Sequence, residues 1–143
     1  MNHFDLVVKA FIVCKEEFLM VQRAEDSHGT FKWTLPGGHV KYGEDLKSAI
    51  QREVKEETHL DVTVADVNTV WDFVASDAHV IGITFLCFLQ EKQTITLNAE
   101  LSSYEWIQMN DISVKNIPKE ILKELETYER RRNQTQAASI EKN

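Results

Sequence analysis

Short runs of apolar residues, most of them rich in β-branched and aromatic side chains, predict strands over much of this chain. Residues 4–14 and Phe18–Arg23 form two such runs, and the polar break between them predicts a β-hairpin. Residues 61–74 are rich in valine and predict a further strand. Residues 78–90 are the most apolar run, which predicts a central strand buried on both faces. Residues 104–109 alternate between apolar and polar positions, so we expect a last short strand there.

Two other segments carry apolar positions at helical spacing. One helix is predicted from about Glu44 to Thr58, with an apolar stripe along one side of a helical wheel drawn at about 100° per residue. A second helix is predicted to open at residues 116–118, because proline is favoured in the first turn. No internal repeat or long linker divides the chain, so we expect a single domain over residues 1–132. Residues 133–143 have little to bury and predict a polar, disordered tail.

Composition and charge exclude several classes of function. The chain has 143 residues, 43% hydrophobic and 27% charged, which is typical of a globular protein. Its net charge of −7 argues against broad binding of duplex nucleic acid. No run approaches the roughly 18–20 apolar residues of a membrane span, and the N-terminal residues lack a signal-peptide pattern. Cys14 and Cys87 lie in apolar runs, so we expect buried free thiols and a cytoplasmic protein.

The first predicted helix becomes acidic on its inward side. Glu53 and Glu57 fall inside the apolar stripe, and Glu56 lies on its edge. Like charges four residues apart destabilise a helix by roughly 0.2–0.5 kcal/mol, and the negative end of the helix dipole adds about 0.3–1 kcal/mol per carboxylate. A divalent cation such as Mg²⁺, which binds carboxylate oxygens, would reverse both effects. The alternative is an ordinary solvated acidic helix, but the inward angle of Glu53 and Glu57 argues against it.

The stretch from Gly38 to Leu60 resembles the Nudix box, G-x5-E-x7-R-E-U-x-E-E-x-G-U, where U is aliphatic. Every defined position matches except one, where His59 replaces glycine. That glycine ends the helix in a left-handed conformation, which histidine tolerates better than most residues. We therefore expect a modest loss of stability at His59. The resemblance extends to the preceding WTLPGG segment and the surrounding strands, and it covers most of residues 4–126.

The resemblance implies an α+β protein with the Nudix fold, an α/β/α sandwich around a mixed β-sheet. It further implies a hydrolase that cleaves a P–O–P linkage in a nucleoside diphosphate joined to a group X, with Mg²⁺ or Mn²⁺ as the cofactor. By position in the box, the metal ligands would be Gly38, Glu53, Glu56 and Glu57, and Arg52 would orient the catalytic glutamates. The general base stays open among Glu53, Glu57 and Glu100. Arg23 would contact a substrate phosphate, or else be a surface arginine at a strand end.

The resemblance leaves the group X open. A nucleoside triphosphate, including an oxidised one, is the preferred substrate, because the chain has no extension before its first strand. The alternatives are a nucleotide sugar such as ADP-ribose, a nucleotide sensor without turnover, and a diphosphate isomerase that would need a catalytic cysteine. Relatives of this kind often form homodimers. Six aromatic residues are candidates for stacking on a base, although we expect most of them to pack in the core: Phe31, Trp33, Trp71, Phe73, Tyr104 and Trp106.

Overall fold

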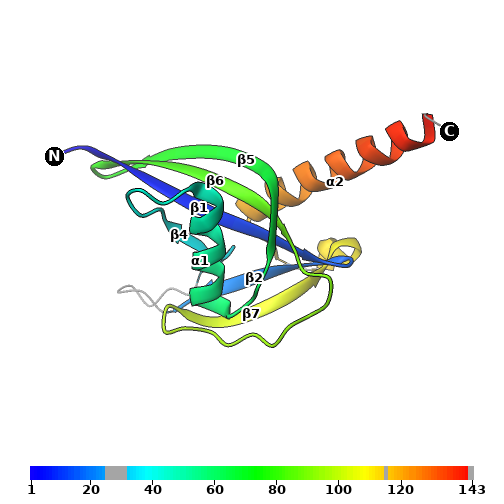
Figure 1. Cartoon of the computed structure of the whole chain (residues 1–143), viewed down its shortest axis with the longest axis horizontal. Coiled ribbons are helices and arrows are strands. Elements are labelled where there is room, and N and C mark those ends of the chain that lie inside the picture. The colour runs from blue at the N-terminus through cyan, green and yellow to red at the C-terminus, as the bar shows by residue number, and fades with distance from the viewer. Residues whose placement is uncertain (25–31, 115, 142–143) are drawn as a thin grey trace.

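The computed structural model describes residues 1–24, 32–114 and 116–141, so Phe31 and His28 lie outside the described residues. A mixed β-sheet is flanked by two α-helices (Figure 1). The strands are β1 (His3–Cys14), β2 (Glu17–Arg23), β3 (Trp33–Thr34), β4 (Gly37–His39), β5 (Thr63–Ala75), β6 (Ala78–Phe88) and β7 (Leu101–Gln108). The helices are α1 (Leu46–Thr58), α2 (Lys119–Glu141) and the short 3₁₀ segment η1 (Met109–Val114).

The sheet combines antiparallel and parallel pairing. Its strand order is β3-β2-β1-β6-β5, with β4 paired to β1 and β7 paired to β2. The predicted hairpin is confirmed, because β1 and β2 pair antiparallel around Val13 and Phe18. β1 and β6 run parallel from His3 to Val13, which makes β6 an interior strand as predicted. Its burial is uneven, however: residues 78–81 are half-exposed, and only the second half is covered well.

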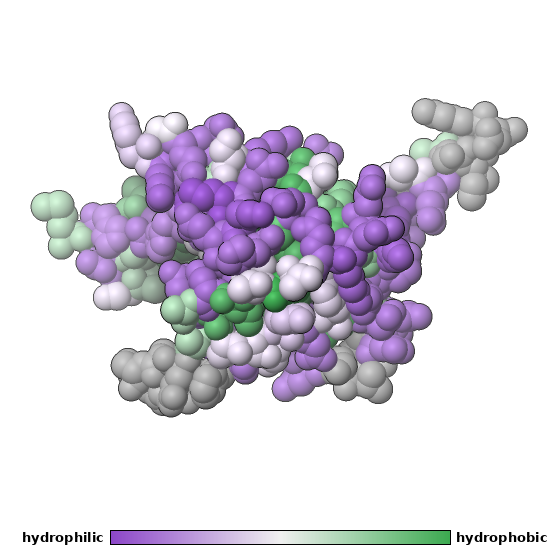
Figure 2. All heavy atoms as spheres, turned by 60° about the horizontal axis from the view of Figure 1, so that its bottom comes forward, coloured by the Kyte–Doolittle hydropathy of each residue, from purple (hydrophilic) through white to green (hydrophobic). Residues whose placement is uncertain are grey.

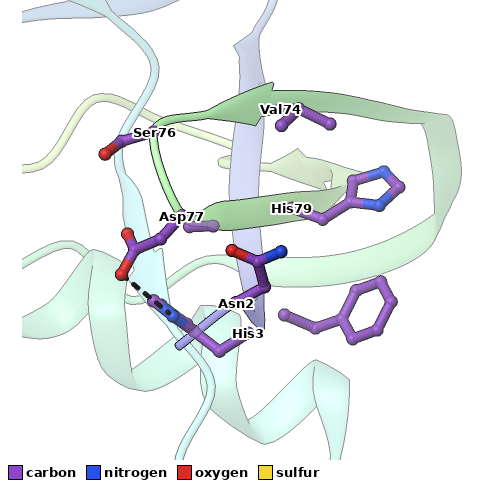
Figure 3. A pocket seen from close by; sticks show the side chains of 8 residues that line it. Asn2, His3, Val74, Ser76, Asp77 and His79 are labelled. Carbon is purple, nitrogen blue, oxygen red and sulfur yellow. Dashed lines mark ion pairs between the residues drawn. The ribbon is translucent and has the colours of Figure 1, made fainter.

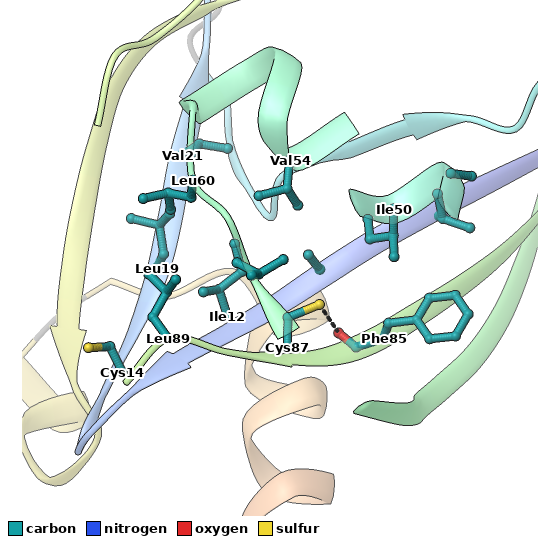
Figure 4. Close-up of a cluster of buried hydrophobic side chains, with 14 of the residues drawn as sticks. Ile12, Cys14, Leu19, Val21, Ile50, Val54, Leu60, Phe85, Cys87 and Leu89 are labelled. Atoms are coloured by element: carbon teal, nitrogen blue, oxygen red, sulfur yellow. Dashed lines mark hydrogen bonds between the residues drawn. The ribbon is translucent and has the colours of Figure 1, made fainter. Parts of the chain in front are cut away.

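Two hydrophobic cores fill the two sides of the sheet, because side chains of β1 alternate between them. Val8, Ala10 and Ile12 face α1 and pack with its apolar stripe (Figure 4). Phe11 and Val13 face the other side and pack with α2. This is the predicted α/β/α arrangement. Cys14 and Cys87 are both buried free thiols, as expected.

A buried polar network fastens α2 to β5. Glu124 is only 5% exposed, and its carboxylate accepts hydrogen bonds from the Thr69 hydroxyl and the Asn68 amide. The Asn68 amide also donates to the Glu124 carbonyl at 2.9 Å. These contacts lie beside the irregular part of β5, where its register against β6 shifts. They therefore set the position of α2 along the sheet.

Helix α2 extends further than the sequence suggested. It continues to Glu141 and projects away from the sheet (Figure 1), and residues 133–138 are exposed. The segment contains no glycine or proline that would end a helix. Disorder of residues 133–143 in solution stays a prediction; residues 133–138 bury no side chain that would hold the helix. Across the described ranges, neither α-helix combines the length and the apolar character that a membrane span requires.

The face carrying β7 and the loop before it is mostly hydrophilic, with patches of hydrophobic residues between the hydrophilic ones (Figure 2). Residues 91–99 form a loop that contains no strand. This loop closes against the end of α1, because Thr96 and Asn98 donate backbone hydrogen bonds to the carbonyls of Thr58 and Glu57. The end of the acidic helix is thereby held from outside the sheet.

Both ends of α1 have a defined cap. The helix begins at Leu46, not at Glu44, because Asp45 is the N-cap and its carboxylate accepts the Ser48 N–H at 2.9 Å. At the other end His59 has φ 65° and ψ 12°, the predicted left-handed conformation, and its N–H reaches the Lys55 carbonyl. The imidazole Nδ1 also lies 2.9 Å from the Thr96 carbonyl. A side-chain contact thus accompanies the strained backbone.

Replacement of His59 tests this cap. His59→Ala keeps a side chain in the left-handed region but removes the imidazole contact, so it should lower the free energy of unfolding by about 1 kcal/mol. His59→Gly also loses the contact but relieves the backbone strain, so it should fall between the wild type and His59→Ala. Urea unfolding monitored by circular dichroism measures the order. An alanine variant as stable as the glycine variant would contradict it.

Candidate active site

Two glycines bring β4 into close contact with both β1 and α1. Gly37 and Gly38 pair with Lys9 and Val8 of β1. A Cβ atom at residue 37 would lie 2.0 Å from the Val8 carbonyl oxygen, and one at residue 38 would lie 2.6 Å from the carboxylate of Glu53. At residue 37 the obstacle is backbone, so only glycine fits there, whereas at residue 38 the obstacle is the end of the flexible Glu53 side chain. The Pro-Gly-Gly turn therefore lets the acidic end of α1 pack directly against the backbone of the sheet.

Glu57 is the most deeply buried of the helix carboxylates. It is 1% exposed, and its Oε1 accepts the Gly37 N–H at 2.8 Å. Its Oε2 is buried without any hydrogen-bond partner. Burial raises the pKa of Glu57 from its ordinary value to about 7, against the opposing effects of the Gly37 N–H and the nearby charges of Arg23 and Lys9. The predicted inward orientation is confirmed for this residue.

Arg52 joins the remaining carboxylates. Its Nε and Nη2 donate to both oxygens of Glu44 at 2.6 and 3.0 Å, and its Nη1 donates to Glu53 and Glu56 at 3.0 and 3.1 Å. Nη2 also donates to the His39 carbonyl. The hydrogen bonds from Arg52, together with the Lys41 N–H, lower the pKa of Glu44 to about 2. Glu44 therefore ties the loop after β4 to the helix, and Arg52 holds Glu53 and Glu56 side by side.

The other predicted site residues lie around this centre. Glu56 is exposed, as its place at the edge of the stripe implied. Arg23 ends β2, and its charge lowers the pKa of both Lys9 and Glu57, where burial is the larger influence. Glu100 is exposed and lies next to Arg23 through the bond from the Ala24 N–H to the Glu100 carbonyl. The structure thus groups Arg23 and Glu100 on the strand ends beside the helix.

Lys9 is a member of the site that sequence reasoning missed. Its side chain runs past Gly37, with Cδ 3.0 Å from the Cβ position there. The ammonium donates to the Thr34 hydroxyl and the Leu35 carbonyl, each at 3.3 Å. Burial, with the charges of Arg23 and Lys32, lowers the pKa of Lys9 to about 8. The only signal in the sequence was a single lysine inside the apolar run of β1.

Two histidines, His3 and His79, lie away from the acidic helix end. His3 and His79 line a hollow of about 180 Å³ at the turn between β5 and β6 (Figure 3). There His3 pairs with Asp77, and His79 pairs with Asp72. These groups contact no member of the acidic helix end in the described structure. They form local surface pairs with aspartates, and the candidate site consists of the glutamates at the helix end.

Three observations test whether the acidic end suits a divalent cation. In the described parts of the chain, no three His, Cys, Asp or Glu side chains converge closely enough to hold a metal ion in their present positions. Glu57 nevertheless has a buried oxygen without a partner. The space left by the missing Cβ of Gly38 is filled by the Glu53 carboxylate. Carboxylate and backbone oxygens are the ligands that Mg²⁺ and Mn²⁺ prefer, so the donor set fits.

Comparison with protein families agrees with this geometry. The model of the NUDIX domain matches residues 3–128. The chain belongs to the NUDIX family. The Nudix relatives include the nucleoside triphosphatase NudI of Salmonella agona, 25% identical over 124 residues that span 74% of this chain and 86% of that protein. NudI of Escherichia coli O17:K52:H18 is 26% identical over 117 residues that span 72% of this chain and 76% of that protein.

Solved structures show the same fold. A MutT protein from Methanosarcina mazei Go1 superposes with a TM-score of 0.77 and 29% identity, covering 92% of this chain and 96% of its own. An Ap4A hydrolase of C. elegans gives a TM-score of 0.73 with 23% identity, covering 87% of this chain and 95% of its own. The predicted α+β Nudix fold is confirmed. This Nudix chain is a hydrolase that acts on pyrophosphate bonds.

Gly38→Ala tests whether the position of the Glu53 carboxylate affects activity without affecting the stability of the fold. The added methyl group would meet the far end of a flexible side chain, so Glu53 moves while the backbone stays. We expect a nearly unchanged melting temperature and a kcat about a hundred-fold lower, as for a misplaced catalytic group. In the double variant with Glu53→Ala, Gly38→Ala should have no further effect. Additive losses would show that Gly38 acts by another route.

The raised pKa of Glu57 predicts that, without metal, the free energy of unfolding depends on pH. Its folded pKa lies above its unfolded value, so its stabilising effect is complete below about pH 4.5 and is lost as the pH rises through about 7. Glu57→Gln stays neutral and should therefore be more stable than the wild type at pH 8, on the order of 2 kcal/mol. Denaturant unfolding in EDTA across this range measures the difference. The difference should vanish near pH 5, and a constant difference would contradict the assignment.

Proposed function

We propose that this Nudix protein is a metal-dependent pyrophosphohydrolase that cleaves a P–O–P linkage in a nucleoside triphosphate. The single observation that carries the proposal is the arrangement at the end of α1. There, one buried carboxylate with an unpartnered oxygen lies beside two carboxylates held by the same guanidinium group. Such a cluster is unfavourable without a cation. A polyphosphate substrate brings several negative charges and needs the same cations.

Gly38, Glu53, Glu56 and Glu57 are the residues proposed to hold the ion. When bound there, Mg²⁺ or Mn²⁺ would neutralise phosphate charge and lower the pKa of the attacking water. The chain itself contributes fixed geometry. The Gly37 N–H holds one oxygen of Glu57 and leaves the other unbound, and α1 provides a rigid support for all three side chains.

Arg52, Glu53, Glu57 and Glu100 have the proposed catalytic roles. Arg52 fixes the rotamers of Glu53 and Glu56 through its bonds to both. Without a bound cation, burial raises the pKa of Glu57 to about 7, and Glu57 is one proposed group for accepting a proton from the attacking water. Glu53 and the exposed Glu100 stay candidates for the same step. The charge of Arg23 acts on both Glu57 and Lys9. At this position the guanidinium group is suited to bind a phosphate of the substrate.

The preference for a nucleoside triphosphate is supported by relatives at 25–26% identity that are named nucleoside triphosphatases. The nucleotide-sugar and sensor alternatives are separated from it by the same substrate panel. The two buried free thiols support placement in the cytoplasm. A homodimer is a further proposal, which light scattering of the purified protein tests.

Glu56→Gln tests the metal proposal. With Mg²⁺, the wild type should release pyrophosphate or phosphate from a panel of nucleoside triphosphates and nucleotide sugars, and EDTA should abolish the release. Glu56→Gln should lower kcat on the order of a hundred-fold or more, because it removes a charged ligand from an exposed position where folding does not depend on it. Glu126→Gln, an exposed glutamate of α2, is the matched control. Tight nucleotide binding without turnover would indicate a sensor.

A further inference from the structure

β5 is an edge strand, and half of its outer edge is open. It lies at one end of the sheet order, so β6 is its only partner among the described strands (Figure 1). Along residues 63–69 the strand is irregular and α2 covers it, with Arg131 donating to the Val67 carbonyl. Residues 70–75 pair regularly with β6, and no described backbone group bonds to their outer edge. The N–H and C=O groups there can pair with another strand.

The open half of β5 lacks the features that usually protect an edge strand. Such strands often carry lysine, proline or a bulge, but residues 70–75 read VWDFVA and keep a regular register. Val70, Phe73 and Val74 are 67%, 51% and 71% exposed. Apolar side chains beside unpaired backbone groups are typical of a site for strand pairing.

This segment is also held in position before any partner arrives. The Trp71 ring fills the space over Gly82 of β6, where an added Cβ atom would lie 2.2 Å from it. Its Nε1 donates to the Thr84 hydroxyl at 2.9 Å, and the Phe73 ring lies 6° from parallel to it. A strand that is already ordered loses less entropy when it binds.

A second copy of the chain offers the same open edge, and a two-fold axis would satisfy both edges at once. An axis perpendicular to the sheet places one residue opposite its own copy. Centred on Asp72, the pairing would oppose two like charges. Centred on Trp71, it would reach residues 67–69, where α2 occupies the edge. Centred on Phe73, it avoids both problems and sets two aromatic rings side by side.

The register centred on Phe73 also brings opposite charges together. It places Thr69 opposite Asp77 of the second copy. The Asp77 side chain is 57% exposed, and its ion pair with His3 spans 3.9 Å (Figure 3). Arg131 is exposed and binds the backbone at Val67, two residues from Thr69 and therefore about 7 Å along the strand. The two-fold axis repeats this arginine–aspartate approach on both sides of the interface.

We propose that residues 70–75 of β5 pair antiparallel with the same residues of a second copy, about a two-fold axis at Phe73, so that two sheets become one. The inference gives an interface to the proposed homodimer and does not depend on the reaction. Six residues from each copy are fewer than the roughly 20–30 of a standard interface. We therefore expect a reversible dimer whose population rises with protein concentration.

Sedimentation velocity over a series of protein concentrations tests the proposal. Phe73→Lys places two like charges opposite each other, so it should raise the dissociation constant of the dimer about ten-fold or more. Asp77→Asn should raise it by only a few-fold, as for an exposed ion pair. Tyr42→Lys, the same change at an exposed aromatic residue in the loop before α1, is the matched control and should dimerise like the wild type. All three residues are exposed, so circular dichroism should show unchanged folds.

Disulfide cross-linking tests the register. Under mild oxidation Phe73→Cys should give a covalent dimer, whereas Val70→Cys, which would lie opposite Ser76, should not. Cys14 and Cys87 are buried and should not react. The proposal is overturned if the protein stays monomeric at every concentration, or if Val70→Cys cross-links as readily as Phe73→Cys. A dimer that survives Phe73→Lys would overturn this interface and keep the proposed homodimer. No measurement here uses turnover, so each of these results leaves the proposed hydrolysis to be judged by its own assay.

Discussion

One guanidinium group joins two carboxylates of a short helix to a third in the loop before it. Arg52 contacts Glu44, Glu53 and Glu56 and also donates to the backbone of β4. Without this positive charge, the glutamates would repel one another at the negative end of a helix dipole. The contacts also join the loop before the helix to the helix itself. The arrangement of the carboxylates and the local fold therefore depend on the same side chain.

The opposite side of the acidic cluster is held by backbone. The two glycines of β4 remove the side chains that would otherwise separate the sheet from α1, and the Gly37 N–H binds the Glu57 carboxylate. The cluster thus lies between the guanidinium group of Arg52 and the backbone N–H of Gly37. Glu57 is held by the sheet, and Glu53 and Glu56 are held by the side chain of Arg52.

The sequence predicted the parts of the fold that follow from local periodicity. The β-hairpin, the interior strand and the acidic helix all come from spacing, and the left-handed cap at His59 comes from one departure in a recognised pattern. The predicted helix start was wrong by two residues. The pattern predicted an acidic first turn at Glu44 and Asp45, but Asp45 is the N-cap and the helix begins at Leu46. The hydrophobic pattern within one β-strand is local. It does not indicate which residues of other strands lie next to it in the sheet.

Lys9 and Trp71 show this limit most clearly. In the sequence, Lys9 interrupts an apolar strand and Trp71 is one of several aromatic residues in a valine-rich run. Their positions beside Gly37 and over Gly82 depend on the register of three strands. That register is set by packing across the whole sheet, which spacing within one strand cannot specify.

The parallel pairing of β1 with β6 has a consequence for how the molecule forms. Each pair in this ladder, such as His3 and Ala78, joins positions far apart in the chain, and α1 lies entirely inside the loop that the ladder closes. The entropy of closing this long loop is lost before the contacts between the two strands stabilise the chain. Such a topology slows folding for a domain of this size. Until then the acidic helix is not stable by itself, since short helices are marginal in water. We therefore expect the acidic cluster to be completed late in folding, only when the two distant strands have met.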